Sequence, residues 1–379
     1  MTTLPPDPVV ADPAPDPGDA RSGRFRLGNR PPLTGIRALG IGAVLVFHAN
    51  FTVFPGAWQA LGLFFTLSGF LITAMLLGER EKTGRVNLRH FYARRATRLL
   101  PPLAITVVAL AVYAAIAPVT DAPHRVWGDI LAATFYYADY RTALGHGSLF
   151  GYLSQTWSLS VEEQFYAIWA LALALILAVG TRRRALAYAA AVAGIVASAA
   201  DRLWIIERAH PFTQAVAVRV YYAFDSRADA IFLGCLLGLV ATGGHLEDWG
   251  PTARRVLSVA ALASVCVLIW IGFEVPLFTR AMVTGWLPLS EVLWAVVLVY
   301  FVVNPEGLGS RFVGLGLFVF VGDLSYTLYL VHWPVYVALY PKPFWPIELA
   351  RLAIIFTIAL ASWFLVERPL MRWRRRALS

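Results

Sequence analysis

The sequence predicts an all-α polytopic membrane protein with about ten transmembrane helices. Of its 379 residues, 58% are hydrophobic and only 15% are charged, whereas soluble domains carry about 25% charged residues. Ten apolar runs approach the length that is needed to cross the hydrocarbon core of a bilayer. The basic residues gather between alternate runs, as the positive-inside rule requires.

Each predicted span is an apolar run that is bounded by charged residues, glycines or prolines. The third run begins at Pro101-Pro102, and proline suits the first turn of a helix. Residues 120–163 are too polar to span, the sixth run is short, and residues 201–228 are amphipathic. The ten runs cover residues 33–53, 58–77, 101–119, 164–180, 185–206, 229–243, 256–273, 284–303, 315–339 and 347–366.

The basic residues predict that both termini are cytoplasmic. With that orientation, 22 of the 32 Lys and Arg residues fall in the inner segments. The inner segments are the N-terminal tail, residues 79–98, 181–184, 243–255 and 304–314, and the C-terminal residues after the tenth run, from 367 on. Membrane orientation therefore explains the formal net charge of +9, and we expect no nucleic-acid partner.

Three regions are expected along the chain. Residues 1–31 form a Pro/Asp-rich and basic tail that cannot bury apolar surface, so we expect disorder there. This tail lacks the apolar core of a cleavable signal peptide. Residues 32–370 form the transmembrane domain, and residues 371–379 form a basic cytoplasmic tail. The two cysteines lie in apolar runs, which predicts neither a disulfide framework nor a metal site.

The first predicted span carries two polar residues that are costly in a membrane, Arg37 and His48. They are eleven positions apart, which is almost three helical turns, so their side chains share one face. Along the helix they are roughly 16 Å apart. Such residues usually face a protein interior or a watery cavity, and a histidine can exchange a proton near neutral pH. A buried packing pair is the alternative, but it leaves the shared face unexplained.

Three arginines cluster before the third predicted span, namely Arg94, Arg95 and Arg98. Arg94 and Arg98 are one helical turn apart and share a face. Guanidinium groups suit phosphate oxygens, so the cluster indicates a cytoplasmic site for a phosphorylated cosubstrate. Plain positive-inside charge is the alternative explanation.

Carboxylates lie near the ends of two predicted spans. Glu162 and Glu163 stand where the long polar stretch meets the fourth span. Neighbours on a helix face different ways, so at most one of the two points into a site. Both can instead be partners of the helix dipole. Glu367 closes the tenth span, where a contact with the next arginine and a role in a site are both open.

Two further motifs also have structural explanations. Arg227 and Asp229 stand at the start of the sixth span, where an internal ion pair between them explains both charges. His332 lies in the aromatic ninth span, either as a packed residue before Pro334 or as a proton carrier.

Taken together, these stretches resemble the acyltransferase 3 family of bacterial integral membrane O-acyltransferases. The resemblance runs in the family's order from about Thr34 to Pro369. Its pieces are Arg37 and His48 with ten residues between them, FFTLSGFLI, FYARRATRLLP, WSLSVEEQFY, DSRADAIFLG, SYTLYLVHWP and VERP.

The resemblance implies transfer of an acyl group, usually acetyl from cytoplasmic acetyl-CoA, to a hydroxyl. Acceptors in the family include cell-envelope glycans, lipid-linked sugars and secondary metabolites such as macrolides. It also implies a multi-pass protein of the bacterial inner (plasma) membrane, surrounded by membrane lipid. Some relatives carry a C-terminal SGNH domain, which we do not expect here because the sequence stops shortly after VERP.

The resemblance also suggests roles for the candidate residues. His48 is expected to be the general base that takes the hydroxyl proton. Arg37, with Arg94, Arg95 and Arg98, is expected to hold the phosphates of acetyl-CoA. Glu163 and Glu367 are expected to orient the histidine or the acceptor. Both direct transfer and an acyl-histidine intermediate remain open.

A transporter or flippase for a lipid-linked glycan is the alternative function. The Arg37 and His48 face is then a path for a proton or an anion. Such a protein needs no acyl-CoA and releases no free CoA.

Overall fold

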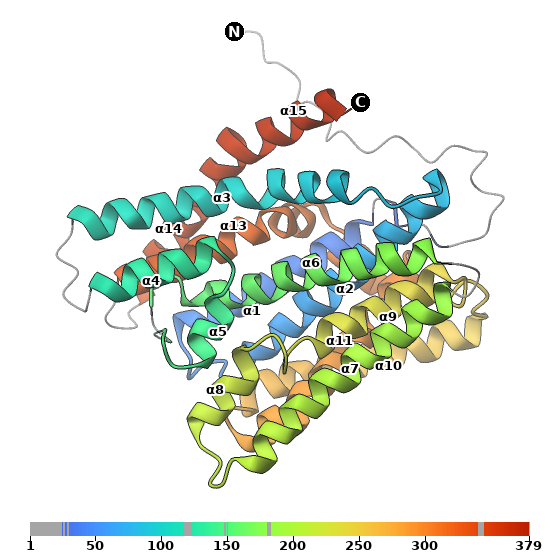
Figure 1. Cartoon of the computed structure of the whole chain (residues 1–379), viewed down its shortest axis with the longest axis horizontal. Helices are drawn as coiled ribbons and strands as arrows, with labels where there is room; N and C mark the ends of the chain where they lie inside the picture. The colour runs from blue at the N-terminus through green and yellow to red at the C-terminus, as the bar shows by residue number, and fades with distance from the viewer. Residues whose placement is uncertain are drawn as a thin grey trace.

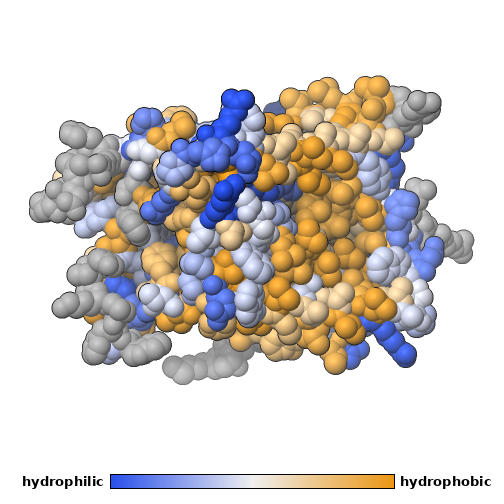
Figure 2. Space-filling view, turned by 90° about the horizontal axis from the view of Figure 1, so that it is seen from below, coloured by the Kyte–Doolittle hydropathy of each residue, from blue (hydrophilic) through white to orange (hydrophobic). Residues whose placement is uncertain are grey.

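The computed structural model describes residues 25, 27–28, 30–116, 123–147, 149, 151–179, 183–339 and 345–378. These residues form helices joined by turns, and no β-strand occurs among them. Eight helical segments are long and apolar enough to cross a membrane. Figure 2 shows a broad apolar area on one face, with hydrophilic residues on both sides of it. The predicted all-α, multi-pass fold is thereby confirmed.

The long helices run roughly along one direction and pack side by side (Figure 1). Every predicted span coincides with a helix, although the bounds differ. The sixth is the 14-residue α9, and the ninth, α13, is largely buried. The long helices are α1 (Pro31–Ala49), α2 (Ala60–Thr83), α3 (Leu88–Ile116), α6 (Trp157–Ala178), α7 (Arg183–Arg208), α9 (Asp229–Thr242), α10 (Pro251–Glu274), α11 (Leu287–Val303), α13 (Gly316–Ala338) and α14 (Trp345–Ser362).

Short elements complete the bundle. Figure 1 shows α4, α5 and α8 at the same end of the molecule. Two π-helical turns join regular helices, one before α11 and one between α14 and α15. The short elements are η2 (Ala57–Gln59), α4 (Pro123–Thr134), α5 (Ala138–Ala143), η3 (Ser154–Thr156), α8 (Gln214–Tyr222), η4 (Met282–Trp286), α12 (Leu308–Val313), η5 (Trp363–Glu367) and α15 (Arg368–Leu378).

The predicted start of the third span is wrong. Helix α3 begins at Leu88 and continues through Pro101-Pro102. Asn87 precedes the first turn, and its side chain accepts a hydrogen bond from the His90 backbone N–H at 3.0 Å, as an N-cap does. The arginine cluster therefore lies on the helix itself. Prolines inside such helices are tolerated because neighbouring groups satisfy the freed backbone.

Helix α1 ends earlier than the first predicted span. Its last residue is Ala49, so His48 lies in the last turn. Asn50 is extended, and its side chain accepts hydrogen bonds from the backbone N–H and the hydroxyl of Thr52, at 2.9 and 2.7 Å. This local turn competes with the helix. Because α1 ends here, His48 lies at the end of the helix that is beside η2 and the start of α2.

Most of the predicted N-terminal tail, residues 1–31, lies outside the described residues. The part that is described packs on the bundle: Phe25 is buried against Phe70, with ring centroids 5.9 Å apart, and the guanidinium of Arg30 lies over its ring. At the other end of the chain, the predicted tail 371–379 is helical as far as Leu378.

The helical path is interrupted between α8 and α9, where residues 223–228, most of them buried, leave the helical conformation. Charges are paired there, but not as predicted from the sequence. Arg227, fully buried, pairs with Glu291 of α11, whereas Asp229 pairs with Arg202 of α7 at 2.6 Å. Arg202 also donates to the Ser226 carbonyl at 2.9 Å. Non-helical backbone deep in a membrane protein requires such internal partners.

Helices α1 and α13 pack closely and run parallel. At Gly322 of α13 a Cβ would overlap the carbonyl oxygen of Thr34, near the start of α1. Further along, the Tyr336 hydroxyl donates to the Leu45 carbonyl at 3.3 Å. The residue numbers of both helices increase from the first contact to the second, so the helices are parallel. The two contacts fix their relative register.

Replacing Arg227 by Leu is expected to lower the free energy of unfolding by about 3–5 kcal/mol, because it leaves the buried Glu291 carboxylate without a partner. Replacing both residues by leucine is expected to cost much less. Unfolding of the purified protein in detergent measures both changes. Arg280→Ala is the matched control, since its partner Glu207 is 65% exposed and Arg280 itself 51%, and we expect a change within about 0.5 kcal/mol there. Equal losses for the single and double variants would contradict the assignment.

Asp139 of α5 is expected to make stability depend on pH. Burial raises the pKa of its carboxyl from 3.8 to about 6, although the Gln164 side chain donates to it and limits the rise. The folded state therefore holds a proton that the unfolded chain releases, so stability falls as the pH rises from about 4 through 6.

Asp139→Asn is expected to remove this dependence and to stabilise the protein at pH 7 by about 2–3 kcal/mol. Melting temperatures between pH 4 and 7 measure the effect, with the exposed Asp248→Asn as the control. A variant whose melting curve tracks that of the wild type at every pH would show that Asp139 is already ionised.

Candidate functional site

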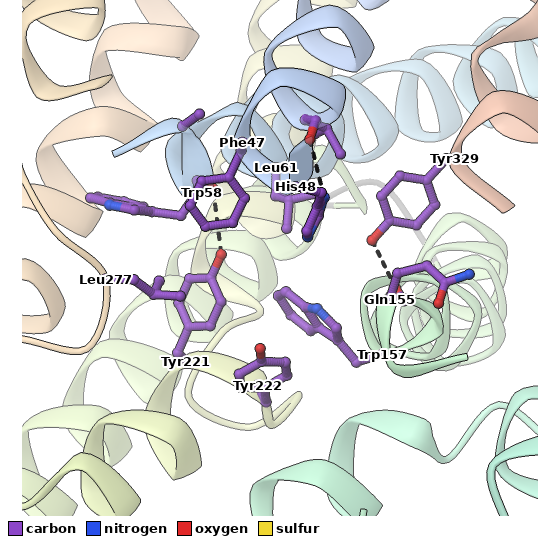
Figure 3. Close-up of a pocket in the computed structure, with 12 residues that line it drawn as sticks. Phe47, His48, Trp58, Leu61, Gln155, Trp157, Tyr221, Tyr222, Leu277 and Tyr329 are labelled. Carbon is purple, nitrogen blue, oxygen red and sulfur yellow. Dashed lines mark hydrogen bonds between the residues drawn. The ribbon is translucent and has the colours of Figure 1, made fainter. Parts of the chain in front are cut away.

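His48 lines a cavity of about 40 Å³ at the end of α1. A cavity of this size has room for about three water-sized groups. In Figure 3 His48 lies above Trp157, with Tyr329 on one side and Phe47 and Trp58 on the other. The walls come from α1, η2, α2, α6, α8 and α13 and from the segments next to α6 and after α10. The lining residues are Val44, Phe47, His48, Ala57, Trp58, Leu61, Gln155, Trp157, Tyr221, Tyr222, Leu277 and Tyr329.

The cavity walls are held by hydrogen bonds to backbone groups. Trp58 donates from its indole N–H to the Val275 carbonyl at 2.9 Å. The Tyr329 hydroxyl donates to the Gln155 carbonyl at 2.7 Å and lies 2.6 Å from the Ser158 hydroxyl. These contacts place the aromatic rings around a rigid space in front of His48.

The amide of Gln155 has one atom engaged and one free. Its Nε2 donates to the Leu330 carbonyl of α13 at 2.9 Å. Its Oε1 is buried without a hydrogen-bond partner among the described residues. Gln155 belongs to the cavity wall, whereas this oxygen is enclosed by protein.

His48 contacts a second histidine. Its Nδ1 lies 3.1 Å from Nε2 of His332 on α13 and 3.1 Å from the Val44 carbonyl oxygen. His332 is fully buried, and its Nδ1 lies 2.6 Å from the Tyr329 carbonyl oxygen. In the described part of the chain no hydrogen bond reaches Nε2 of His48. That nitrogen is therefore the one available to a ligand in the cavity.

Arg37 lies on α1 about three turns before His48 and faces several charges. Glu162 of α6, Asp323 of α13 and Arg98 of α3 are all within electrostatic range of its guanidinium. Its Nε is buried without a hydrogen-bond partner, and Arg37 forms no ion pair among the residues that the structure describes. Buried donors are normally satisfied, so this group is poised to bind an anion.

Arg95 and Glu163 form an ion pair at 2.8 Å that links α3 to α6. The guanidinium of Arg95 also lies over the Tyr166 ring, 3.4 Å from its centroid. The Tyr166 hydroxyl donates to Glu162 at 2.8 Å. Glu163 therefore contacts an arginine of the predicted cosubstrate site and does not contact His48.

The remaining predicted residues lie further from His48. Arg94 turns toward α2, where Nη2 is 3.9 Å from the Glu79 carboxylate and Nη1 is 3.2 Å from the ring of His90. Glu367 accepts hydrogen bonds from the hydroxyls of Thr327 and Ser362, at 2.7 and 2.9 Å. Thus neither predicted carboxylate touches His48.

The structure therefore gathers the candidate residues into two connected groups. One group contains Arg37, Arg95, Arg98, Glu162 and Glu163, which lie on α1, α3 and α6. The other is the cavity with His48, at the end of α1. Helix α6 runs antiparallel to α1, so its Tyr166 and Glu162 lie toward the first group and its Trp157 lies in the cavity.

Comparison with known proteins identifies the family. Residues 32–368 match the model of a family described as an acyltransferase domain, the acyltransferase 3 family. The chain belongs to this family. No solved structure matches it.

Curated members of the acyltransferase 3 family are similar to the chain. It is 28% identical over 365 residues to the peptidoglycan O-acetyltransferase OatA of Listeria monocytogenes, covering 93% of this chain and 57% of OatA. It is 27% identical to a putative peptidoglycan O-acetyltransferase of Bacillus subtilis, covering 92% and 56%. A putative O-acetyltransferase of Staphylococcus aureus is 28% identical, with 80% and 50% covered. The chain thus spans about half the length of these relatives.

The acyltransferase motifs converge in space. FFTLSGFLI lies on α2, the arginine cluster on α3, WSLSVEEQFY on α6 and SYTLYLVHWP on α13. One residue of the site, His332, had only a weak sequence signal, namely a histidine among aromatic residues in an apolar run. Its contact with His48 joins residues 284 positions apart in sequence. A local sequence pattern cannot predict a contact between residues so far apart along the chain.

Proposed function

We propose that this chain is a membrane-embedded O-acetyltransferase that moves an acetyl group from acetyl-CoA to a hydroxyl of a cell-envelope glycan. One observation carries the proposal. Arg37 has no ion-pair partner among the described residues, and it lies on the same helix as His48, whose Nε2 is open to a cavity. The guanidinium of Arg37 suits a phosphate, and the imidazole of His48 suits proton transfer.

The donor site combines Arg37 with Arg98. Both lie near carboxylates without a direct ion pair in the described structure, so their guanidinium groups can take phosphate oxygens. Arg95 is held by Glu163 and Tyr166, and its charge adds to the positive potential of the same site. Arg94, on the neighbouring surface, is available only if it leaves Glu79. The pantetheine arm then follows the face of α1 over roughly 16 Å toward His48.

The chemistry requires a base at the reacting hydroxyl. The hydroxyl oxygen attacks the thioester carbonyl carbon while its proton passes to Nε2 of His48. The carbon–sulfur bond then breaks, and the thiolate of CoA takes up the proton from Nε2 of His48. The products are an acetyl ester and free CoA.

The character of the cavity supports a sugar as the acceptor. Six of its twelve lining residues are Phe, Tyr or Trp, and no Asp, Glu, Lys or Arg lines it. Aromatic rings offer flat apolar faces with polar edges. They suit the edge of a sugar that carries the reacting hydroxyl, because the cavity has room for about three water-sized groups and not for a whole sugar ring. The names of the relatives point to peptidoglycan.

The positive-inside pattern supports an orientation with cytoplasmic termini in the bacterial plasma membrane. Arg37 then lies toward the cytoplasm, where acetyl-CoA is found. The His48 cavity opens toward the outer end, where a cell-envelope glycan is found. The same orientation brings the acyl group part of the way through the membrane inside the protein.

His48→Ala is expected to lower kcat by about 10²–10⁴-fold, because it removes the general base. The KM for acetyl-CoA is expected to change little. The measurement follows thiol release by the purified full chain in nanodiscs, with acetyl-CoA and muropeptides as acceptor. The exposed His245→Ala is the matched control. Wild-type turnover by His48→Ala would remove His48 from the mechanism.

Arg37→Ala is expected to weaken acetyl-CoA binding by about 10–100-fold, since a hydrogen bond to a charged group contributes about 1.5–3 kcal/mol. Isothermal titration calorimetry with acetyl-CoA measures the loss. Arg255→Ala, an exposed arginine of α10, is expected to bind as the wild type does. If the wild-type protein neither binds acetyl-CoA nor releases CoA with any acceptor, the transporter or flippase becomes the better explanation of the polar face.

A further inference from the structure

The hydrogen bonds around the two histidines define which nitrogen carries a proton. The Tyr329 carbonyl oxygen can only accept, so Nδ1 of His332 carries a hydrogen toward it. In the neutral ring Nε2 of His332 is then an acceptor. The hydrogen in the 3.1 Å contact therefore belongs to Nδ1 of His48.

A second acceptor supports this assignment. The Val44 carbonyl oxygen also lies 3.1 Å from Nδ1 of His48, and it too can only accept. An N–H at Nδ1 of His48 can donate to the Val44 carbonyl oxygen and to Nε2 of His332, whereas an unprotonated Nδ1 could bond to neither acceptor. Neutral His48 thus keeps its lone pair on Nε2, the nitrogen that is open to the cavity.

We propose that His332 is the positioning and proton-carrying partner of His48, an inference that rests on the proposed acyl transfer. When the acceptor hydroxyl attacks, its proton bonds to Nε2 of His48. The proton on Nδ1 of His48 moves at the same time to Nε2 of His332. The positive charge then resides on His332, whose Nδ1–H points at the Tyr329 carbonyl. When the CoA thiolate takes the proton from Nε2 of His48, the other proton returns from Nε2 of His332 to Nδ1 of His48, and both rings are neutral again.

The surroundings of the pair explain why a second histidine is needed. Among the described residues no carboxylate contacts His48: of the predicted ones, Glu163 pairs with Arg95 and Glu367 is held by two hydroxyls. A cation on His48 alone would face an aromatic cavity without a counter-charge. Transfer to His332 places the charge beside the Tyr329 carbonyl oxygen, which lies 2.6 Å from Nδ1 of His332 and is closer than the Val44 carbonyl oxygen is to Nδ1 of His48, at 3.1 Å.

The other titratable groups near the pair are uncharged phenols. On α13 the rings of Tyr329 and Tyr336 lie 5.3 and 6.1 Å from His332. From α8 the rings of Tyr221 and Tyr222 line the cavity. The nearest charges from α14 are Arg351, whose guanidinium lies 5.6 Å from the Tyr336 ring, and its partner Glu348. None of these groups substitutes for His332 as a proton acceptor.

A spectroscopic test reads the tautomer without activity. The full chain, labelled with ¹⁵N at its seven histidines, is placed in nanodiscs, and the His48 signals are identified by their loss in His48→Gln. We expect an Nδ1–H tautomer in the wild type and in His332→Gln, whose side-chain oxygen can accept the same hydrogen. In His332→Ala we expect a mixture of tautomers. An Nε2–H tautomer of His48 in the wild type would overturn the proposal.

A kinetic test separates proton transfer from positioning. Rates of CoA release are measured in mixtures of H₂O and D₂O. A curved dependence on deuterium content is expected for the wild type, because two protons move together, and a linear one for His332→Gln. For this variant we also expect kcat to fall at least about tenfold, as for the loss of an acid–base group, with KM for acetyl-CoA within about twofold.

The exposed His146→Gln is the matched control and is expected to match the wild type in both measurements. Wild-type kcat in His332→Gln, or a linear dependence in the wild type, would refute the relay while leaving the acetyl transfer intact. Absence of CoA release from the wild type with every acceptor would instead refute the proposed function, and the ¹⁵N spectra would still decide the pairing of the two histidines.

Discussion

The close, parallel packing of α1 against α13 is the constraint on which the site depends. Gly322 of α13 has no room for a side chain beside Thr34, and Gly35 of α1 has none beside the carbonyl of Val313, the last residue of α12 just before α13. Small residues let two helix backbones approach in this way. Once the register is fixed near the start of α1, the same register continues along both helices. It sets Asp323 near Arg37 and His332 against His48.

This register divides one helix face into two chemical environments. Around Arg37, charged side chains from α3, α6 and α13 approach one another. Around His48, the walls are aromatic and the only polar contacts are hydrogen bonds. A thioester with a charged phosphate end and a small neutral acyl end matches this gradient. In the proposed reaction the phosphates would meet guanidinium groups, and the reacting carbon would meet the lone pair on Nε2 of His48, which has no carboxylic acid beside it among the described residues.

The sequence predicted the helices and one half of the site, for reasons that are local. Apolar runs give helices, and the spacing of Arg37 and His48 places them on one face. The start of α3 was missed because Asn87 caps a helix outside the apolar run. The partners of Glu163, Arg227 and His332 were missed because each contact joins distant helices. Charge type shows that a partner is needed, but only the packing of the helices decides which one.

The buried arginines of this bundle differ in whether a carboxylate pairs with them directly, and this difference separates arginines that stabilise the fold from an arginine that can bind a ligand. Arg227 and Arg202 are each matched by a carboxylate, and they stabilise the break between α8 and α9. Arg37 is near two carboxylates but directly bonded to neither. A desolvated cation without a direct partner is costly unless something else binds there. The cost is reasonable if an anionic cosubstrate completes the site in each turnover. By the same argument the neutral cavity of His48 needs no permanent counter-charge, because His332 can take the proton for the short time that the reaction requires.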